Sequence, residues 1–474
     1  MKKKFISLLL TLAAVMPAGA QQVLTLDECR QMARDNNKAL SMASAEQRAA
    51  YYQRKSAFTN YLPKVSATGG YMFTSREISL LNDEQKSTLP HLGDAVAAQL
   101  GQAMPQLPIG QLLQGPLNAA GQSLVDALDT DTRNAGALAV MLTQPVYMGG
   151  KIRAYNKIAR LAEQAAADKY DIALQDVMVE VDETYWQIVA LTAKKELAES
   201  YLKLVEDLDK DVEAMVSEGV ATKADGLSVK VKANQANVAL IQVNNGLSLL
   251  KMLMCQIIGL DVNTDISLAD ESMLDNLTAE TEMPVGAASE SWRTDRPELR
   301  ALGRAAEVDN QRVKLALAET MPTVALTGGY SLMNPSLFNG FENKFHNLWS
   351  VGVVVNIPIV TWGDRIYKVK AAKARSQVAK LKLDEATEKI ELQIAQSRQK
   401  VEESRKRLAA SESAAGVAEE NLRIATLGME EGVIPVINVN EAQTAWLGAR
   451  SELIAAKIDM KLAAIHLQRA LGTI

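Results

Sequence analysis

The sequence predicts an internally duplicated membrane protein of mixed α and β structure. Its strands should contribute to a β-barrel, and its long antiparallel helices should continue that barrel as a tube. Three observations carry this prediction. One long stretch of the chain occurs twice, two runs of 68 and 64 residues are rich in strong helix formers, and four short segments are rich in β-forming residues.

The duplication relates residues 145–259 to residues 358–472 at a constant offset of 213. A second pair precedes it, because residues 61–71 (YLPKVSATGGY) match residues 320–330 (TMPTVALTGGY) at an offset of 259. Two copies of one supersecondary unit must pack together to bury their apolar faces, so the chain should form one pseudo-symmetric assembly.

The first twenty residues predict a secretory signal peptide. Lys2, Lys3 and Lys4 precede an apolar run over residues 5–16, and Ala18 and Ala20 fit a small-x-small cleavage site. The mature chain should begin near Gln21. A retained membrane anchor is the alternative, although the apolar run is too short to span a bilayer.

Helix lengths predict the topology. Residues 151–218 contain neither Gly nor Pro, and a helix of that length would be about 100 Å long. Residues 364–427 repeat the pattern. Return helices should follow over residues 220–258 and 433–471, and shorter helices over 37–62 and 296–321. A return helix and a short helix laid end to end match one long helix, which predicts two continuous and two broken columns.

Four segments should form strands, namely residues 64–73, 136–147, 323–332 and 348–360. In the last, Trp349, Val351 and Val353 alternate with small or polar residues, as in transmembrane barrel strands. Tyr71, Tyr330, Trp349 and Trp362 read as aromatic residues at the membrane interface. A small soluble sheet is the alternative. Four strands cannot close a barrel, so several copies of the chain should share one.

The remaining segments lie outside the repeat. Residues 76–134 form a long loop with a short helix near 112–128, and residues 260–295 form a polar linker between the copies. The predicted organisation runs in order: 1–20, 21–62, 63–149 with loop 76–134, 150–259, 260–295, 296–321, 322–362 and 363–474.

The chain resembles the outer membrane efflux proteins of the TolC type. The resemblance rests on the duplicated plan, on RPEL at residues 296–299, and on RALG at residues 469–472. Its sharpest element is EEGVIPVINVNEAQ at residues 430–443, opposite SEGVATKADGLS at residues 217–228.

This resemblance implies a homotrimer with a 12-stranded β-barrel in outer membrane lipid and an α-helical tunnel through the periplasm. It implies the exit duct of a tripartite efflux or type I secretion system. The helical tips would meet a periplasmic adaptor (membrane fusion) protein, which couples the passive duct to an inner-membrane transporter of the RND or ABC type.

The resemblance also points to residues at the tip. The tunnel constriction of the family maps onto Asn438 and Glu441, with Asp225 as a member of the closing latch. The latch partners fall on Met429 and Ile434, which cannot make the family's polar links, so closure needs other links or apolar packing. An ordinary solvated carboxylate is the alternative for Glu441.

Adaptor contact is assigned to exposed residues of the two turns. A turn requires glycine whatever it touches, which is the alternative for part of the set. The candidates are Gly219, Val220, Gly432, Val433 and Pro435.

Composition excludes several classes. Loss of residues 1–20 leaves 48 basic and 56 acidic residues, and a net charge of −8 argues against nucleic acid. Three histidines without ligand spacing and no phosphate loop argue against an enzyme, a metal site or a cofactor. Cys29 and Cys255 could pair or remain buried thiols. The rival function is an exported coiled-coil scaffold without a lumen.

Overall fold

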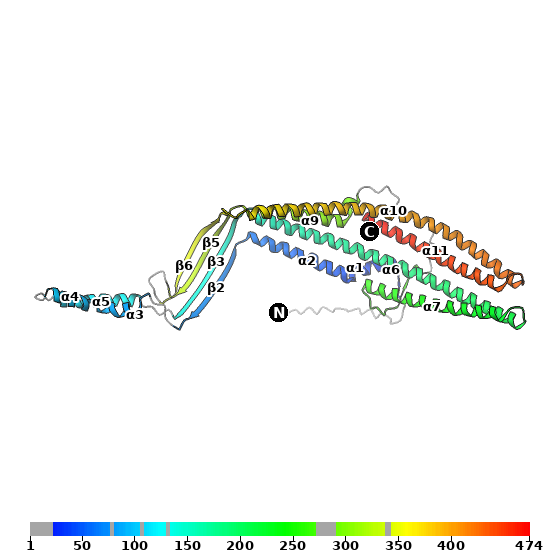
Figure 1. Ribbon diagram of the computed structural model, residues 1–474, viewed down its shortest axis with the longest axis horizontal. Coiled ribbons are helices and arrows are strands. Elements are labelled where there is room, and N and C mark those ends of the chain that lie inside the picture. Colours follow the sequence, from blue (N-terminus) through cyan, green and yellow to red (C-terminus); the bar gives the residue numbers. More distant parts are fainter. Residues whose placement is uncertain (1–21, 76–79, 105–108, 129–132, 272–290, 337–342) are drawn as a thin grey trace, which may run out of the picture. The chain divides into compact units, whose positions relative to one another are not determined.

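The computed structural model describes residues 22–75, 80–104, 109–128, 133–271, 291–336 and 343–474. The predicted signal peptide and residues 272–290 of the predicted linker lie outside these ranges. The chain forms two compact units (Figure 1). Of the described residues, one unit contains those within 22–51, 161–307 and 377–474, and the other contains those within 52–160 and 308–376.

The second unit is built on a four-stranded antiparallel sheet of order β2-β3-β5-β6. These strands are β2 (Lys64–Phe73), β3 (Asn134–Met148), β5 (Thr323–Asn334) and β6 (His346–Asn356). Within the described chain, β2 and β6 each pair on one side only, so both edges of the sheet present free hydrogen-bonding groups. The four predicted strands are therefore present, and they leave the sheet open.

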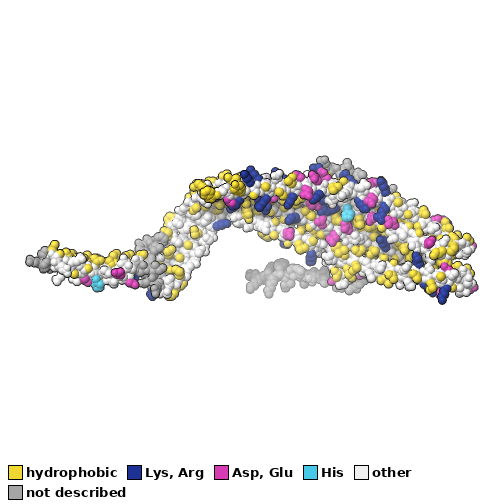
Figure 2. Space-filling view, in the orientation of Figure 1, with side chains coloured by type: hydrophobic (Ala, Val, Ile, Leu, Met, Phe, Trp, Pro, Cys, Tyr) yellow, Lys and Arg dark blue, Asp and Glu magenta, His cyan; other side chains and the backbone are white. Residues whose placement is uncertain are grey.

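Register gives the sheet two different faces. Ala67, Val140, Tyr330 and Trp349 lie directly opposite one another across the four strands and share one face. Alternation along the strands places mainly apolar and aromatic residues on this face, which we call the apolar face. The other face carries small and hydroxyl residues such as Ser66, Thr68, Thr143, Thr327 and Ser350. Figure 2 shows hydrophobic side chains on the surface where strands pass into helices.

Strand β6 ends earlier than expected. The prediction extended it to residue 360, but β6 ends at Asn356, before Ile357 and Pro358. Proline has no N–H for a ladder and disfavours many conformations of the residue before it. The equivalent Pro145 in β3 is followed by a bulge between Pro145 and Tyr147, so both copies lose regular pairing at the same point.

The long helices α6 (Lys151–Ser217) and α10 (Asp364–Glu430) each have 67 residues. Their return partners α7 (Lys223–Ile258) and α11 (Val436–Leu471) each have 36. The return helices begin three residues later than expected, because residues 220–222 and 433–435 form the turn and the cap. The shorter helices are α2 (Lys38–Phe58) and α9 (Pro297–Ala318), preceded by α1 (Leu26–Asn36) and α8 (Trp292–Asp295).

Backbone conformation repeats the duplication. Glycines that open, turn and close each copy have positive φ angles, which glycine adopts without the steric penalty of a Cβ atom. The matched φ values differ by no more than 5° at an offset of 213. The pairs are Gly150 and Gly363 (87° and 85°), Gly219 and Gly432 (76° and 71°), and Gly259 and Gly472 (80° and 76°).

The broken columns are joined where a return helix ends against a short helix. In copy one the side-chain amide of Asn37 donates to the carbonyl of Ile257, at 2.9 Å, in the last turn of α7. The same residue accepts from the backbone N–H of Ala39 at 2.8 Å, at the start of α2. A Cβ on Gly259 would lie 2.5 Å from Cβ of Asn36, so only glycine permits this approach.

The second joint uses a different side chain at the equivalent place. Arg296 donates to the carbonyls of Arg469 and Ala470, at 2.6 and 2.9 Å, in the last turn of α11. Asn37 and Arg296 match at the offset of 259, and Ile257 and Ala470 match at 213. Both joints therefore satisfy carbonyl groups that a helix C-terminus leaves without intrahelical partners.

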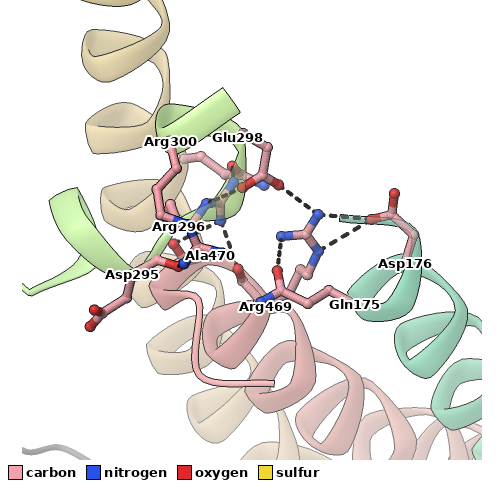
Figure 3. A network of polar contacts seen from close by, with 9 residues as sticks. Gln175, Asp176, Asp295, Arg296, Glu298, Arg300, Arg469 and Ala470 are labelled. Carbon is pink, nitrogen blue, oxygen red and sulfur yellow. Dashed lines mark hydrogen bonds and ion pairs between the residues drawn. The ribbon is translucent and has the colours of Figure 1, made fainter. Parts of the chain in front are cut away.

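Figure 3 shows the polar network around the second joint. The Arg469 guanidinium contacts Asp176, Glu298 and Gln175 at 2.7–2.8 Å. Burial opposes ionisation of Glu298, but its backbone hydrogen bond and Arg469 hold its pKa below the ordinary value. A depressed carboxyl pKa stabilises the fold above the ordinary pKa, and this contribution is lost as the pH falls through the folded value.

Further ion pairs connect the short helix α9 to α6. Arg300 contacts Asp168 at 3.0 Å and Asp171 at 2.6 Å, and Arg304 also pairs with Asp168. The carboxylate of Asp168 is almost fully buried. Since α9 presents its arginines four residues apart on one face, it is fixed to α6 over more than one turn.

Copy one is held by a buried cluster and one bidentate pair. Arg30 of α1 binds both carboxylate oxygens of buried Asp182 at 2.7 Å. Cys29 and Cys255 are free thiols within the adjacent apolar core, and burial raises the pKa of Cys29 to about 12. The alternative of a disulfide is therefore wrong, and the cysteines act as small apolar residues.

Two short strands were not predicted. β1 (Gln22–Leu24) pairs in parallel with β4 (Ile266–Leu268), which lies in the linker between the copies. Leu24 and Ile266 are buried in the same core as Cys29. The linker is thus anchored on the first residues of the described chain.

The long loop between β2 and β3 contains a helical hairpin. It comprises α3 (Asp83–Thr88), α4 (Leu92–Ala103) and α5 (Ile109–Leu128), where one short helix was predicted. Asp94 of α4 accepts hydrogen bonds from Gln114 and Asn118 of α5 at 2.8 and 2.7 Å, which lower its pKa to about 2. Residues 76–79, 105–108 and 129–132 of this loop lie outside the described ranges.

We expect Asn37→Ala to lower the free energy of unfolding by about 1–3 kcal/mol, because it leaves the buried Ile257 carbonyl without a partner. The thermal midpoint followed by helix circular dichroism measures this change. The adjacent Asn36→Ala is the control, since it keeps the Cβ atom that packs on Gly259. Equal shifts in the two variants would contradict the role of the joint.

Candidate functional site at the hairpin tips

The two hairpins turn through identical backbone hydrogen bonds. In copy one, Gly219 N–H donates to Val216 O, and the N–H groups of Val220 and Ala221 donate to Met215 O. In copy two, Gly432 N–H donates to Met429 O, and the two following N–H groups donate to Gly428 O. Each turn thereby satisfies the last carbonyls of its long helix, with glycine in the left-handed conformation.

The two turns carry one large and one small side chain each, in opposite order along the sequence. Copy one places Met215 opposite Ala221, whereas copy two places Gly428 opposite Ile434. A Cβ on Gly428 would lie 2.5 Å from Cδ1 of Ile434, so this glycine makes room for the isoleucine. One large and one small residue fill each turn in opposite order, which preserves close packing.

The return helices start differently. In copy one, Thr222 and Asp225 form a capping box, in which Asp225 Oδ2 accepts from Thr222 N–H at 2.9 Å and from its hydroxyl at 2.6 Å. These bonds lower the pKa of Asp225. Asp225 is therefore engaged within its own hairpin, and its part in a latch between the hairpins stays a prediction. In copy two, Pro435 occupies the cap position and makes no side-chain cap bond.

The residue equivalent to Asp225 in copy two is Asn438. Because Pro435 stands at the cap position in place of Thr222, Asn438 takes no part in a capping box. Asn438 and Glu441 are exposed and lie three residues apart on one face of α11. The residues between and beyond them, Val439, Ala442 and Gln443, are buried against the rest of the unit. The structure thus presents Asn438 and Glu441 together and holds Asp225 in a local role within its own hairpin.

The adaptor-contact candidates form the ends of the hairpins. Val220 is 71% exposed and Val433 is 78% exposed, and both follow the left-handed glycines Gly219 and Gly432. Pro435 is exposed as well. Two large apolar side chains at matching positions of the duplicated tip have no cover within the described chain.

A buried cluster joins the two hairpins behind the tips. It draws Val205, Val212, Val229, Met429 and Val439 from all four helices. Lys232 of α7 adds a polar link by donating to the hydroxyl of Thr444 on α11 at 3.0 Å. Sequence reasoning missed this link, because neither residue belongs to a recognisable pattern.

The predicted interfacial aromatics divide into two groups. Tyr71, Tyr330 and Trp349 lie on the apolar face, and the Tyr71 hydroxyl donates to Asn134 Oδ1 at 2.6 Å. Trp362 lies beyond the strand, 94% exposed, with a φ of 49° that is rare for a bulky residue. Its equivalent in copy one is Gly149, with a φ of 61°.

Among the described residues, no group of three or more His, Cys, Asp or Glu side chains could hold a metal ion. Of the described helices, α7 alone is long and apolar enough to cross a bilayer, and only 11% of its apolar stretch is buried.

We expect opposite effects of alanine at two glycines of α10. Gly416→Ala should stabilise the protein by about 1 kcal/mol, because its Cβ meets open space in a helix. Gly428→Ala should be destabilising, since its Cβ collides with Ile434. Adding Ile434→Ala should remove that penalty, as copy one already has Ala221 there. Thermal unfolding of the three variants tests the exchange, and no rescue in the double variant would refute it.

Comparison with known proteins places this architecture. The family model described as outer membrane efflux protein matches residues 29–248 and 289–473. The chain is 22% identical to the outer membrane efflux protein BepC of Brucella suis, over 72% of this chain and 73% of that protein. It is 24% identical to the protein CyaE of Bordetella pertussis, over 73% of this chain and 72% of the relative.

Solved structures agree on the fold. The outer membrane protein VceC of Vibrio cholerae superposes with a TM-score of 0.73 at 18% identity, covering 94% of this chain and 96% of that one. The CmeC outer membrane channel of Campylobacter jejuni gives a TM-score of 0.74 at 15% identity, over 94% and 85%. The chain belongs to the outer membrane efflux protein family, and it is an efflux channel with a β-barrel in the outer membrane and a helical tunnel in the periplasm.

Proposed function

We propose that the channel is a homotrimer in which β6 of each copy pairs with β2 of the next. Each chain supplies four strands and two unpaired edges, and no open edge can face lipid. Two copies would give eight strands, which is about the smallest number that can close a barrel. Three copies give twelve strands, as the family resemblance implies. The open sheet edges support this proposal most directly.

The exposed helices support the same assembly. Helix α7 carries large apolar residues that face solvent in the single chain, including Leu227, Val231, Val238, Ile241 and Leu249. A helix with this much exposed apolar surface is stable in the periplasm only if neighbouring subunits cover it.

The constriction of the tunnel lies at the inner tips. Threefold symmetry would place three copies of Glu441 and of Asn438 around one axis, three carboxylates beside three amide dipoles. Such a ring attracts cations and repels anions. Asp225 contributes through the shape of its hairpin, since its carboxylate is engaged by Thr222.

Closure relies on apolar packing more than on polar links. Met429 is buried in the cluster behind the tips, and Ile434 packs on Gly428, so neither offers a polar latch. Near the tips, Lys232 donates to the hydroxyl of Thr444 in an exposed link between the hairpins, and such links contribute little. Opening would separate an apolar seam between the hairpins.

The tips dock on a periplasmic adaptor protein, and through it on an inner-membrane transporter of the RND or ABC type. Val220 and Val433 are the apolar contacts, with Gly219, Gly432 and Pro435 fixing the shape of the surface. The channel is a passive conduit in an efflux or type I secretion system, and the transporter supplies the energy. The exported chain reaches the outer membrane through the predicted cleaved signal peptide.

The trimer predicts heat-modifiable mobility. Protein extracted from the outer membrane in detergent should migrate in SDS gels as a stable oligomer and convert to a monomer on heating. A closed barrel has no free strand edge at which unfolding can begin. Protein recovered wholly from the soluble fraction as a monomer would instead favour the rival scaffold without a lumen.

Charge removal at the constriction should change ion block. We expect Glu441→Gln to weaken block of the channel by multivalent cations in a planar bilayer, because it removes the charged ring. Glu412→Gln is the control, since Glu412 is an exposed carboxylate on α10 away from the tip. Unchanged block in Glu441→Gln would remove that residue from the constriction.

A further inference from the structure

A basic groove lies where the sheet of the second unit passes into its helices. It encloses about 830 Å³ between the first turns of α6 and the last turns of α9. Gly149 and Gly150 form one end, and the side of α6 contributes Arg153, Lys157 and Arg160. These cations are four and three residues apart, so they project from one face of the helix.

The groove has no compensating acid. Lys314 of α9 adds a fourth cation, and none of the ten lining residues is acidic. Within the described chain these four cations form no ion pair, whereas Arg312 and Lys368 of the same unit pair with Asp309 and Asp364. The field of the groove is therefore positive and unneutralised.

The groove lies at a level where lipid headgroups can reach it. Strand β3 ends at Met148, so the groove begins at the rim of the barrel, where lipid headgroups lie. Tyr147 pairs with Val324 on the apolar face and immediately precedes this rim. Leu317 lines the groove and is partly exposed, which offers apolar surface beside the cations.

We propose that this groove binds the phosphate group of a phospholipid from the periplasmic leaflet of the outer membrane. Arg153 and Arg160 can each donate two parallel N–H bonds to phosphate oxygens, and Lys157 and Lys314 supply point charges. The acyl chains would follow the apolar face above. The site depends on the barrel being in the outer membrane, and it requires neither the gate nor the adaptor.

The matching positions of the second copy carry a different set of side chains. At the offset of 213, Arg153 corresponds to Ile366, while Lys157 and Arg160 correspond to Lys370 and Lys373. Lys370 and Lys373 are exposed on α10 and line no part of the groove. They provide a control of equal charge, equal position in the repeat and comparable distance from the rim.

The test compares Lys157→Gln/Arg160→Gln with Lys370→Gln/Lys373→Gln in the full-length detergent-extracted protein. Bound phosphatidylglycerol is measured by native mass spectrometry. Each basic residue near a membrane surface contributes about fivefold, so the groove variant should bind roughly 25-fold more weakly. The control variant should retain wild-type binding, and diacylglycerol, which lacks phosphate, should not be retained.

Three results would overturn the proposal. Equal lipid retention in both variants would show that the groove is not the site. Inorganic phosphate binding as tightly as phosphatidylglycerol would assign the groove to a free anion. A changed ion selectivity in planar bilayers, with unchanged lipid binding in the groove variant, would place these cations in the lumen. Retained SDS-resistant mobility shows that both variants are folded.

Discussion

The whole architecture depends on how each return helix, α7 or α11, is joined end to end with a short helix from another part of the sequence. A helix C-terminus leaves carbonyls that need donors, and here a side chain from the following short helix supplies them. Asn37 does so for α7, and Arg296 does so for α11. Without these bonds, each broken column would end in buried, unpaired carbonyls, and the two hairpins would have no fixed axis on which to pack.

The second joint carries far more charge than the first. Arg296 brings a guanidinium into a nearly buried position, and Glu298 and Arg469 surround it. Such a cluster is stable only when every member has a partner, because burial of a lone charge is expensive. A neutral amide achieves the same connection in copy one. The two joints are geometrically equivalent and electrostatically different.

Most of the fold could be predicted, because helix-forming runs, glycine positions and the offset of 213 are local signals. The strand ends, the helices α1 and α8, and the hairpin α3–α5 were missed or misjudged because they depend on tertiary partners or on proline at one position. At the tips, the family resemblance pointed to Asn438 and Glu441, which lie three residues apart on the exposed side of α11, and their role in the constriction stays a prediction. The sequence alone could not show that Thr222 donates to the carboxylate of Asp225, or that Gly428 accommodates Ile434, because both depend on contacts across a turn.

The exchange of volume at the tips has an evolutionary consequence. Met215 with Ala221 and Gly428 with Ile434 are two solutions to one packing problem, and Ile434 is compatible only with a glycine at position 428. Transfer of a single residue between the copies by recombination would produce an overfilled or an empty turn. The pairs can change only together. Such coupling protects the two halves of a duplicated gene from being made identical again, and leaves each tip free to specialise.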